Sequence, residues 1–477
     1  MAQVNITPPG GVTVPETAPG ATLPGGTTTV PGQGTTAISP TGTTTGAPPA
    51  AVTLPPINIL PLGTTVQNPS TQLVPGASDT YSGIFTLGAG DRGEDLGMTL
   101  GSFRLYPQLD ISAGYDTNVF AQSASQGVVG SPYTTIAPSL ALRSEWLNHQ
   151  LNMLLSANFG LYSATPTQNY QNYVVLADGQ IDVREDTQVK WSIGYKRATE
   201  ALGSPNVAFA QSPTVDESIP VILSINKRFN RFWVDAGVSA TPMTFTDYST
   251  ITSQGLTGAQ RNRTEYEEHI RFGYDVSDEL SVYMTPSVKQ IRYVENIDPT
   301  TGLGRDQDIA QLVFGATVIL NPTSSLDGYI GYMNQSTVGQ GAIGDITFGL
   351  TGTWNAYEPL TVRPMITRAF SQSALSGYQS YINTTYGFDF NYRIHEDWTM
   401  IGGASLTSTD YQVAPGASGV TPRTDYFLRG SIGLLYSIRP QIQIGPVIEY
   451  TQGSSTDPVN GPSYDRELFS IRLIGKR

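Results

Sequence analysis

Apolar and polar residues alternate along many segments of this chain from residue 101 onwards. In residues 103–115 the odd positions carry Phe, Leu, Pro, Ile, Ala and Tyr, whereas Arg104, Gln108 and Asp110 lie between them. Successive side chains of a strand point to opposite faces, so this period of two predicts strands with one apolar and one polar face. The same alternation recurs at 151–161, 189–195 and 378–392. In the last segment we expect the even positions, including Ile382 and Tyr386, to share one face.

Short and long connections alternate between these segments. Tight turns are predicted near 146–149, 184–186, 229–231, 277–279, 321–324, 356–359, 394–397 and 437–440. Consecutive turns are separated by two strand patterns and a looser polar loop. Examples of these loops are 118–131, 200–213, 247–260, 295–304, 412–422 and 453–463. Eight turns and nine loops imply about eighteen strands of roughly 12 to 16 residues each.

This arrangement is typical of a membrane barrel. In hydrocarbon every backbone amide needs a partner, so a spanning sheet must close on itself. We therefore expect an all-β fold, a closed antiparallel transmembrane β-barrel of about 18 strands, wide enough to hold water. A soluble propeller or sandwich would show a repeated blade motif or shorter strands. The short turns predict that both barrel ends are periplasmic and that the long loops are extracellular, in a bacterial outer membrane.

Aromatic residues support the membrane interpretation. Trp146, Trp233, Trp354 and Trp398 all lie within a few residues of a predicted tight turn. Amphipathic rings favour the two interfaces of a bilayer, so we expect these side chains to belong to an aromatic girdle. The alternative is that Trp and Tyr are simply common in strands.

Residues 1–95 have a different composition, dominated by Pro, Thr, Gly and Ala. No aromatic residue precedes Tyr81, and the charged residues before Asp91 are Glu16 and Asp79. Such a segment buries too little apolar surface to offset its ordering entropy, so we expect a disordered periplasmic arm before a barrel domain at 101–477. The arm is either an inert linker or a segment that enters the lumen or reaches a periplasmic partner. We also expect that a secretory signal has been removed from this numbering.

The overall composition excludes several classes of protein. The net charge is −13, and nucleic-acid binding is not expected because it requires clustered Lys and Arg. No apolar run reaches the roughly 18 residues of a spanning helix. There is no Cys, and the three histidines, His149, His269 and His395, lack the spacing of a zinc site. We expect no enzyme, no catalytic residue, no metal and no cofactor.

One strand pattern, at 261–276, is unusually rich in charge, and charged side chains disfavour the lipid face. We expect its charged residues to face the lumen together with others from neighbouring strands. The candidate pore-lining residues are Arg261, Arg263, Glu265, Glu267, His269, Arg271, Lys190, Lys289, Arg363, Asp389, Arg393 and Arg429. They form either a salt-bridged, solvated wall or a mixed-charge lining that selects solutes.

Two short motifs carry a family resemblance. Residues 101–109, Gly-Ser-Phe-Arg-Leu-Tyr-Pro-Gln-Leu, and 114–120, Gly-Tyr-Asp-Thr-Asn-Val-Phe, resemble the opening of the putative β-barrel porin 2 family. Pro138, Leu140 and the run Ser144-Glu145-Trp146 in the next strand are similar as well. The resemblance covers the barrel, about 101–477, and implies an outer-membrane location.

The resemblance also points to barrels that accompany capsule and exopolysaccharide export. Our leading hypothesis is therefore an outer-membrane conduit of a polysaccharide secretion system. The alternatives are a general diffusion porin for small solutes and a structural or surface-interaction protein. The expected partners are outer-membrane lipid, periplasmic polysaccharide-export components, and polysaccharide or small solutes in the lumen.

Overall fold

The computed structural model describes residues 2–3, 58–59, 97–200, 202–206, 213–246, 256–299, 301–457 and 460–477. The predicted arm at 1–95 lies outside the described residues, apart from two strands of two residues each. These strands, β1 (Ala2–Gln3) and β2 (Asn58–Ile59), pair with each other.

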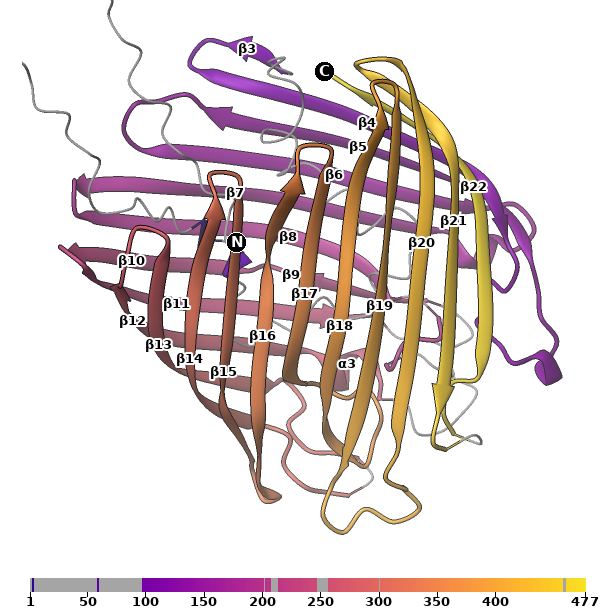
Figure 1. Cartoon of the computed structure of the whole chain (residues 1–477). Helices are drawn as coiled ribbons and strands as arrows, with labels where there is room; N and C mark the ends of the chain where they lie inside the picture. The colour runs from indigo at the N-terminus through magenta and orange to yellow at the C-terminus, as the bar shows by residue number, and fades with distance from the viewer. Residues whose placement is uncertain are drawn as a thin grey trace, which may run out of the picture.

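Eighteen strands form a closed antiparallel barrel, as the alternation predicts (Figure 1). In order they are β4 (Phe103–Asp116), β5 (Ser131–Ser144), β6 (Gln150–Tyr162), β7 (Tyr170–Arg184), β8 (Thr187–Glu200), β10 (Val221–Phe229), β11 (Phe232–Phe245), β12 (Arg263–Asp275), β13 (Leu280–Tyr293), β14 (Gln307–Asn321), β15 (Ser324–Thr337), β16 (Gly341–Tyr357), β17 (Leu360–Ser371), β18 (Tyr378–His395), β19 (Trp398–Val413), β20 (Thr424–Arg439), β21 (Ile442–Ser455) and β22 (Tyr464–Lys476). Each strand pairs with the next, and β22 closes the barrel on β4, with Phe469 opposite Tyr115. The predicted fold class is confirmed.

Two short strands supplement this ring. β9 (Thr214–Ser218) pairs with β8 on one side and β11 on the other, and it continues the position of β10 in the wall. Ile219 and Pro220 separate β9 from β10. Pro has no N–H to give to a ladder, which explains an interruption at this point. β3 (Met98–Leu100) pairs with the start of β4. Among the described residues, the helices are η1 (Ala124–Gln126), η2 (Pro166–Gln168) and α3 (Gly258–Arg261), and none of them is long and apolar enough to cross a membrane.

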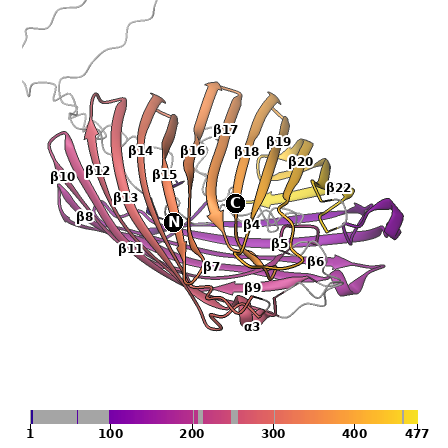
Figure 2. The same ribbon diagram turned by 90° about the horizontal axis from the view of Figure 1, so that it is seen from below.

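The connections divide between the two ends of the barrel (Figures 1 and 2). Two-residue turns join several strand pairs at one end, here called the turn end; they are 185–186, 230–231, 322–323, 358–359, 396–397 and 440–441. Longer connections, such as 117–130, 294–306 and 414–423, lie at the other end, here called the loop end. Asn230 has a φ of +58°, a left-handed conformation that Asn tolerates better than most residues, and it allows a reversal within two residues.

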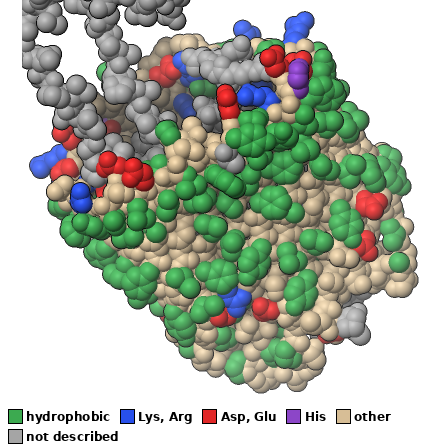
Figure 3. Space-filling model, viewed as in Figure 1, with side chains coloured by type: hydrophobic (Ala, Val, Ile, Leu, Met, Phe, Trp, Pro, Cys, Tyr) green, Lys and Arg blue, Asp and Glu red, His purple; other side chains and the backbone are tan. Residues whose placement is uncertain are grey.

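The outer surface of the barrel is apolar. In β14, Phe314 is 55% exposed whereas its neighbour Val313 is fully buried, as expected if alternate side chains face outward and inward. Other exposed apolar side chains, such as Leu312, Ile330 and Tyr332, share the outward face. Figure 3 shows hydrophobic side chains spread over the visible wall. This surface is suited to contact with lipid.

The aromatic girdle is only partly confirmed. Trp146, Trp354 and Trp398 are exposed on the outside near the turn end. Trp233 is buried instead, and its indole N–H donates to Asp275 and Ser281, at 3.2 Å in each case. Trp233 follows the outward Phe232, so the alternation of β11 turns it inward. The prediction that Trp233 belongs to the girdle is therefore wrong.

Candidate functional site

Residues 370–385, the end of β17, its connection to β18 and the first half of β18, form a hairpin that is buried on both faces. Every side chain in this range is buried, from Phe370 and Ser371 to Thr384 and Thr385. A strand in the wall of a barrel exposes alternate side chains to the outside, as β18 itself does from Tyr386 onwards. Residues 370–385, here called the in-folded hairpin, therefore lie inside the barrel at the loop end.

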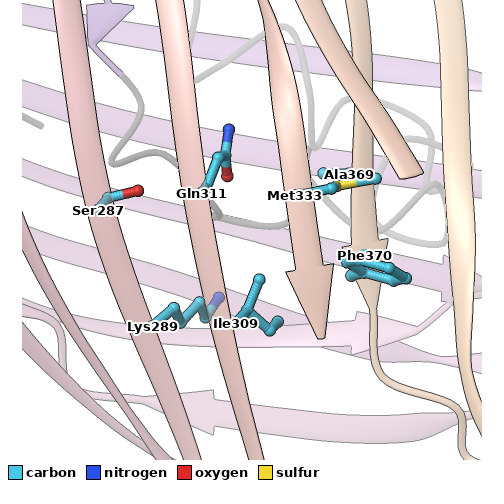
Figure 4. A pocket seen from close by; sticks show the side chains of 7 residues that line it. All are labelled: Ser287, Lys289, Ile309, Gln311, Met333, Ala369 and Phe370. Carbon is cyan, nitrogen blue, oxygen red and sulfur yellow. The ribbon is translucent and has the colours of Figure 1, made fainter. Parts of the chain in front are cut away.

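One face of the in-folded hairpin packs on the inner side of β13–β15. Phe370 and Ile382 form a buried cluster with Ile291, Ile309 and Met333. Figure 4 shows Phe370 and Ala369 of β17 beside Ile309 and Met333, in a small pocket that Ser287, Lys289 and Gln311 also line. Ile382 and Tyr386 hold like positions of the continuous strand β18, as predicted, but Ile382 is 3% exposed and packs on the inner side of β13–β15 instead of facing the exterior.

Amides and hydroxyls add polar contacts to this interface. Gln335 Nε2 donates to Ser380 Oγ at 3.1 Å, and Gln379 Nε2 donates to Thr337 Oγ1 at 2.6 Å. Gln307 Nε2 also donates to the carbonyl oxygen of Gln379, at 2.9 Å. These bonds satisfy polar groups that burial would otherwise leave at a cost.

The tip of the in-folded hairpin contacts loops from distant strands. The backbone N–H of Ala374 donates to Asn206 Oδ1 at 3.0 Å, and its carbonyl accepts from the N–H of Leu256 at 2.9 Å. Ser376 Oγ donates to Asp298 Oδ1 at 3.1 Å. Tyr411 of β19 donates its hydroxyl to the carbonyl of Pro205 at 2.8 Å.

These contacts span the mouth of the barrel. β8, which precedes Asn206, and β17 are the fifth and thirteenth of the eighteen strands, so eight positions separate them, against nine for opposite walls. A regular barrel of this strand number, with strands about 4.8 Å apart and tilted by about 40°, would be roughly 35 Å across its backbone. Contact between segments so far apart on the ring means that the in-folded hairpin and the buried loop 202–206 together span the mouth and narrow it.

The strand β12 turns most of its charged side chains inward, with the exposed Glu268 as an exception. Arg263, Glu267 and Arg271 are buried, whereas the alternate residues Tyr266 and Ile270 are exposed outside. The inward position of the charged set agrees with the expectation from the alternation.

Glu265 is the centre of one ion-paired group on this wall. Its Oε1 lies 2.8 Å from Arg263 Nε, and its Oε2 lies 2.7 Å from Lys289 Nζ of β13. Two cations thus share one carboxylate, and all three side chains have little exposure. Such charge-assisted bonds are stronger than neutral ones and hold the side chains in place.

Arg261 lies outside the strand in which the sequence pattern places it. It is the last residue of α3, and β12 begins two residues later, at Arg263. Thr257 caps this short helix together with Gln260, because each side chain bonds the other's backbone. Arg261 Nη2 lies 2.6 Å from Glu200 Oε1, both groups are almost fully buried, and the guanidinium lies 4.2 Å from the ring centroid of Phe245.

Two further candidates on β12 have separate partners. His269 Nε2 lies 3.1 Å from Asp235 Oδ1 of β11, and the ring occupies space left by Gly237, where a Cβ would be 2.6 Å from His269 Cε1. Arg271 Nε donates to Thr285 Oγ1 at 3.0 Å, and its guanidinium lies 4.4 Å from the ring centroid of Tyr283.

Lys190 of β8 and Glu267 are the least satisfied of the predicted charges. Both are more than nine-tenths buried. Within the part of the chain that the structure describes, neither Lys190 Nζ nor Glu267 Oε1 has a hydrogen-bond partner.

The remaining candidates are distributed around the barrel. Arg363 Nε donates to Asp389 Oδ2 at 2.7 Å across β17 and β18. Arg429 Nη2 lies 2.9 Å from Glu449 Oε2 across β20 and β21. Arg393 lies near the turn end of β18, where its backbone N–H donates to the carbonyl of Pro359 at 2.8 Å. The predicted set is therefore a series of small groups around the wall, of which the group around β12 is the largest.

Sequence reasoning missed the in-folded hairpin and the role of Glu200. A signal for the hairpin was present, because Ile291, Ile309 and Met333 are apolar at inward positions of β13–β15, where polar residues are expected. Glu200 is the last residue of β8, and its partner Arg261 lies 61 residues later in the chain. The local pattern around Glu200 therefore gives no indication of this ion pair. No group of three or more His, Cys, Asp or Glu side chains that could hold a metal occurs among the residues that the structure describes.

A comparison with solved structures finds similar chains of low sequence identity. The outer membrane protein OpdK from Pseudomonas aeruginosa is 10% identical, with a TM-score of 0.40 over 78% of this chain and 99% of that one. OccK3 (OpdO) from Pseudomonas aeruginosa is also 10% identical, with a TM-score of 0.39 over 78% of this chain and 95% of that one. The FrpB iron transporter from Neisseria meningitidis is 8% identical, with a TM-score of 0.40 over 80% and 82%. A comparison with curated proteins finds no match.

The family comparison is more informative. The family model described as "Putative beta-barrel porin 2" matches residues 91–477, which include the whole barrel and both motifs near residues 101–120. The chain therefore belongs to the putative beta-barrel porin 2 family and is an outer-membrane β-barrel of the porin type.

Proposed function

We propose that this barrel is a diffusion channel for small hydrophilic solutes, with its narrowest part at the loop end. The observation that carries the proposal is the in-folded hairpin, residues 370–385, which crosses the mouth of a barrel whose inner wall is polar and ion-paired. Water and small polar solutes interact favourably with such a wall, whereas a mouth narrowed in this way is unfavourable for a thick polymer.

The charged groups of the inner wall would act as the selectivity elements of this path. Arg263, Glu265 and Lys289 carry a net positive charge as a group, and Lys190 adds a third cation farther around the wall. Fixed charges in a narrow, partly desolvated passage affect ions of opposite sign strongly. The proposed lining comprises these residues with His269, Arg271 and the pairs Arg363–Asp389 and Arg429–Glu449.

The proposed orientation places the turn end in the periplasm and the loop end outside the cell. Short turns at one end and long loops at the other support this orientation, because outer-membrane barrels show this asymmetry. The N-terminal segment would then begin in the periplasm.

Conductance in planar lipid bilayers, combined with swelling of liposomes in sugars of increasing size, tests the proposal. We expect discrete conducting steps in salt and entry of small sugars, with exclusion of larger ones. Silent bilayers and unswollen liposomes would contradict a channel and favour a structural or surface-interaction protein.

A conduit for exported polysaccharide is the second candidate. It is supported by tyrosines on the inner face, such as Tyr106 and Tyr283, whose rings and hydroxyls suit weak contacts with sugars. Deletion of the gene followed by measurement of secreted polymer tests this candidate, and unchanged secretion would exclude it.

A further inference from the structure

The wall of the barrel is incomplete where the in-folded hairpin leaves it. β16 and β17 pair from Tyr357 opposite Leu360 to Phe348 opposite Arg368. Beyond this point, β16 continues to Gly341 and pairs with β15, but within the described residues 301–457 it has no register with β17. The N–H of Ile346 donates to the side chain of its neighbour Asp345, at 2.7 Å, where a complete wall would give it a strand partner. Among the described residues, no strand other than β15 pairs with β16 from Gly341 to Thr347, so this edge is available for pairing.

We infer that the in-folded hairpin is a gate, which opens when β17 extends its pairing along this edge of β16. The inference rests on the proposed channel function and adds its regulation. Extension of the existing register places Phe370 opposite Ile346 and Ser371 opposite Asp345. The hairpin would then belong to the wall, and the mouth that it now crosses would widen.

The side chains of the hairpin suit both positions. In the extended register, Phe370 would share a face with Ile346 and Phe348, and Ile382 would share a face with Tyr386. Ile346 and Tyr386 are exposed on the outer surface. Phe370 and Ile382 would thus leave the buried apolar cluster and join the apolar outer surface of the barrel. Neither position exposes these side chains to water.

The contacts that hold the closed position are of a kind that can be exchanged. Several of them join amides and hydroxyls, as in Gln335 with Ser380 and Gln379 with Thr337. A hydrogen bond between such groups contributes little net stability, since water replaces the partner when the contact opens. In return, the open position pairs backbone groups of β16, which is strongly favoured wherever the edge meets hydrocarbon. The hydrogen bonds lost on opening are thus offset by the backbone pairing gained along β16. The closed and open positions are then similar in free energy, as a gate requires.

One ion pair bridges the point where β17 separates from β16, here called the fork. Arg368 Nη2 lies 2.6 Å from Asp345 Oδ2, and Thr347 Oγ1 donates to the carbonyl of Arg368 at 2.7 Å. Arg368 already lies opposite Phe348, and its side chain reaches Asp345 across the open fork between the two strands. In the extended register, residues 369–371 of β17 would lie against residues 345–347 of β16 and would fill this space. The Arg368–Asp345 pair must therefore break when the gate opens, and it stabilises the closed position.

The absence of Cys from the chain allows the gate to be locked in either position. The cysteines of the double variant Asp345→Cys with Ser371→Cys face each other only in the extended register. A disulfide between them therefore locks the gate open. The pair Gln335→Cys and Ser380→Cys, joined by a short bifunctional thiol reagent, locks it closed. Leu312→Cys with Tyr332→Cys, register partners on the outer face of β14 and β15, is the matched control.

Single-channel recordings on the membrane-inserted full chain then test the inference. We expect the open lock to hold the largest conductance state until reductant is added, and the closed lock to abolish that state. The control pair should change neither. In addition, Asp345→Asn should increase the fraction of time in the large state, whereas Asp308→Asn, which breaks the exposed outer pair with Arg292, should not.

Two results would overturn the gate. One is failure of the 345–371 disulfide to form in the inserted protein, measured by mass spectrometry of cleaved peptides. The other is equal conductance in both locked forms, which would leave the channel function intact. Silence of every variant, including one in which a short Gly-Ser linker replaces 372–376, would overturn the channel function and the gate with it.

Discussion

The guanidinium of Arg466 in β22 holds the carboxylate of Asp116 in β4, across the contact that joins the last strand of the barrel to the first. Arg466 Nε lies 3.1 Å from both carboxylate oxygens, and Nη2 lies 2.5 Å from Oδ2. Asp116 is fully buried, and the hydroxyl of Tyr162 lies 3.4 Å from its Oδ2. The two charged residues are 350 positions apart in the sequence. The pair therefore stabilises barrel closure at the loop end.

Loss of this pair should weaken the barrel. In Asp116→Asn, Arg466 keeps its charge in a buried site without a counter-charge, and breaking a buried pair in this way costs about 3–5 kcal/mol. We expect a lower temperature for the loss of the compact band on unheated gel electrophoresis and a lower urea midpoint. Asp308→Asn is the control, since its exposed pair with Arg292 should contribute only about 0–1 kcal/mol. Equal stability of both variants would argue against a closing role.

A glycine beneath Trp233 provides a second test of stability. A Cβ on Gly273 would lie 2.0 Å from Trp233 Cε2, so Gly273→Ala must displace a buried ring that donates to Asp275 and Ser281. We expect a loss of about 1–3 kcal/mol, typical of overpacking. Gly430→Ala, in β20, meets nothing within 4 Å and should be almost neutral. Denaturation in urea compares the two, and a neutral Gly273→Ala would contradict the inward position of Trp233.

Removal of one carboxylate from the inner wall should change ion selectivity. Glu265→Gln leaves Arg263 and Lys289 without their shared anion, so the wall becomes more positive. If this wall lines the path, the reversal potential in a salt gradient should shift towards anion preference. Glu268→Gln removes a carboxylate from the exposed outer face of the same strand and should leave the potential unchanged. An identical response to both substitutions would exclude a lining role for Glu265.

The turn end carries a pH-sensitive contact. Lys227 Nζ lies 2.5 Å from Asp186 Oδ2, and the hydrogen bond from Lys227 lowers the pKa of the Asp186 carboxyl from its ordinary value; Thr187 adds a smaller effect. Because the folded pKa is lowered, this contact stabilises the fold above the ordinary Asp pKa of about 4, and its contribution is lost as the pH falls through the lowered value. The contribution should be small, because Asp186 is fully exposed.

Titration of Asp186 by NMR measures this effect directly. Lys227→Gln removes the ammonium and should return the pKa of Asp186 towards its ordinary value. An unchanged titration curve would mean that the ion pair does not persist in the folded protein.

The sequence by itself was sufficient for the architecture of the wall. Alternation of period two is a local property, since each side chain faces lipid or lumen according to its own position in a strand. Thus Arg263, Glu267 and Arg271 were expected to face inward, and they do. The strand number followed from the same local signals, because short turns and long loops alternate along the chain.

Contacts between distant segments were decided only by the tertiary structure. The in-folded hairpin depends on the fit of Phe370 and Ile382 to Ile291, Ile309 and Met333, and no local pattern states that such residues meet. The pairs Arg261–Glu200 and Arg466–Asp116 are likewise set by which strands become neighbours and by where loops return over the mouth. Trp233 is a further example. Its nearness to a turn predicted a place at the membrane interface, but its position in β11, next to the outward Phe232, directs the side chain inward. Local periodicity assigns each residue to a face, whereas closure and in-folding of the barrel determine what that face contacts.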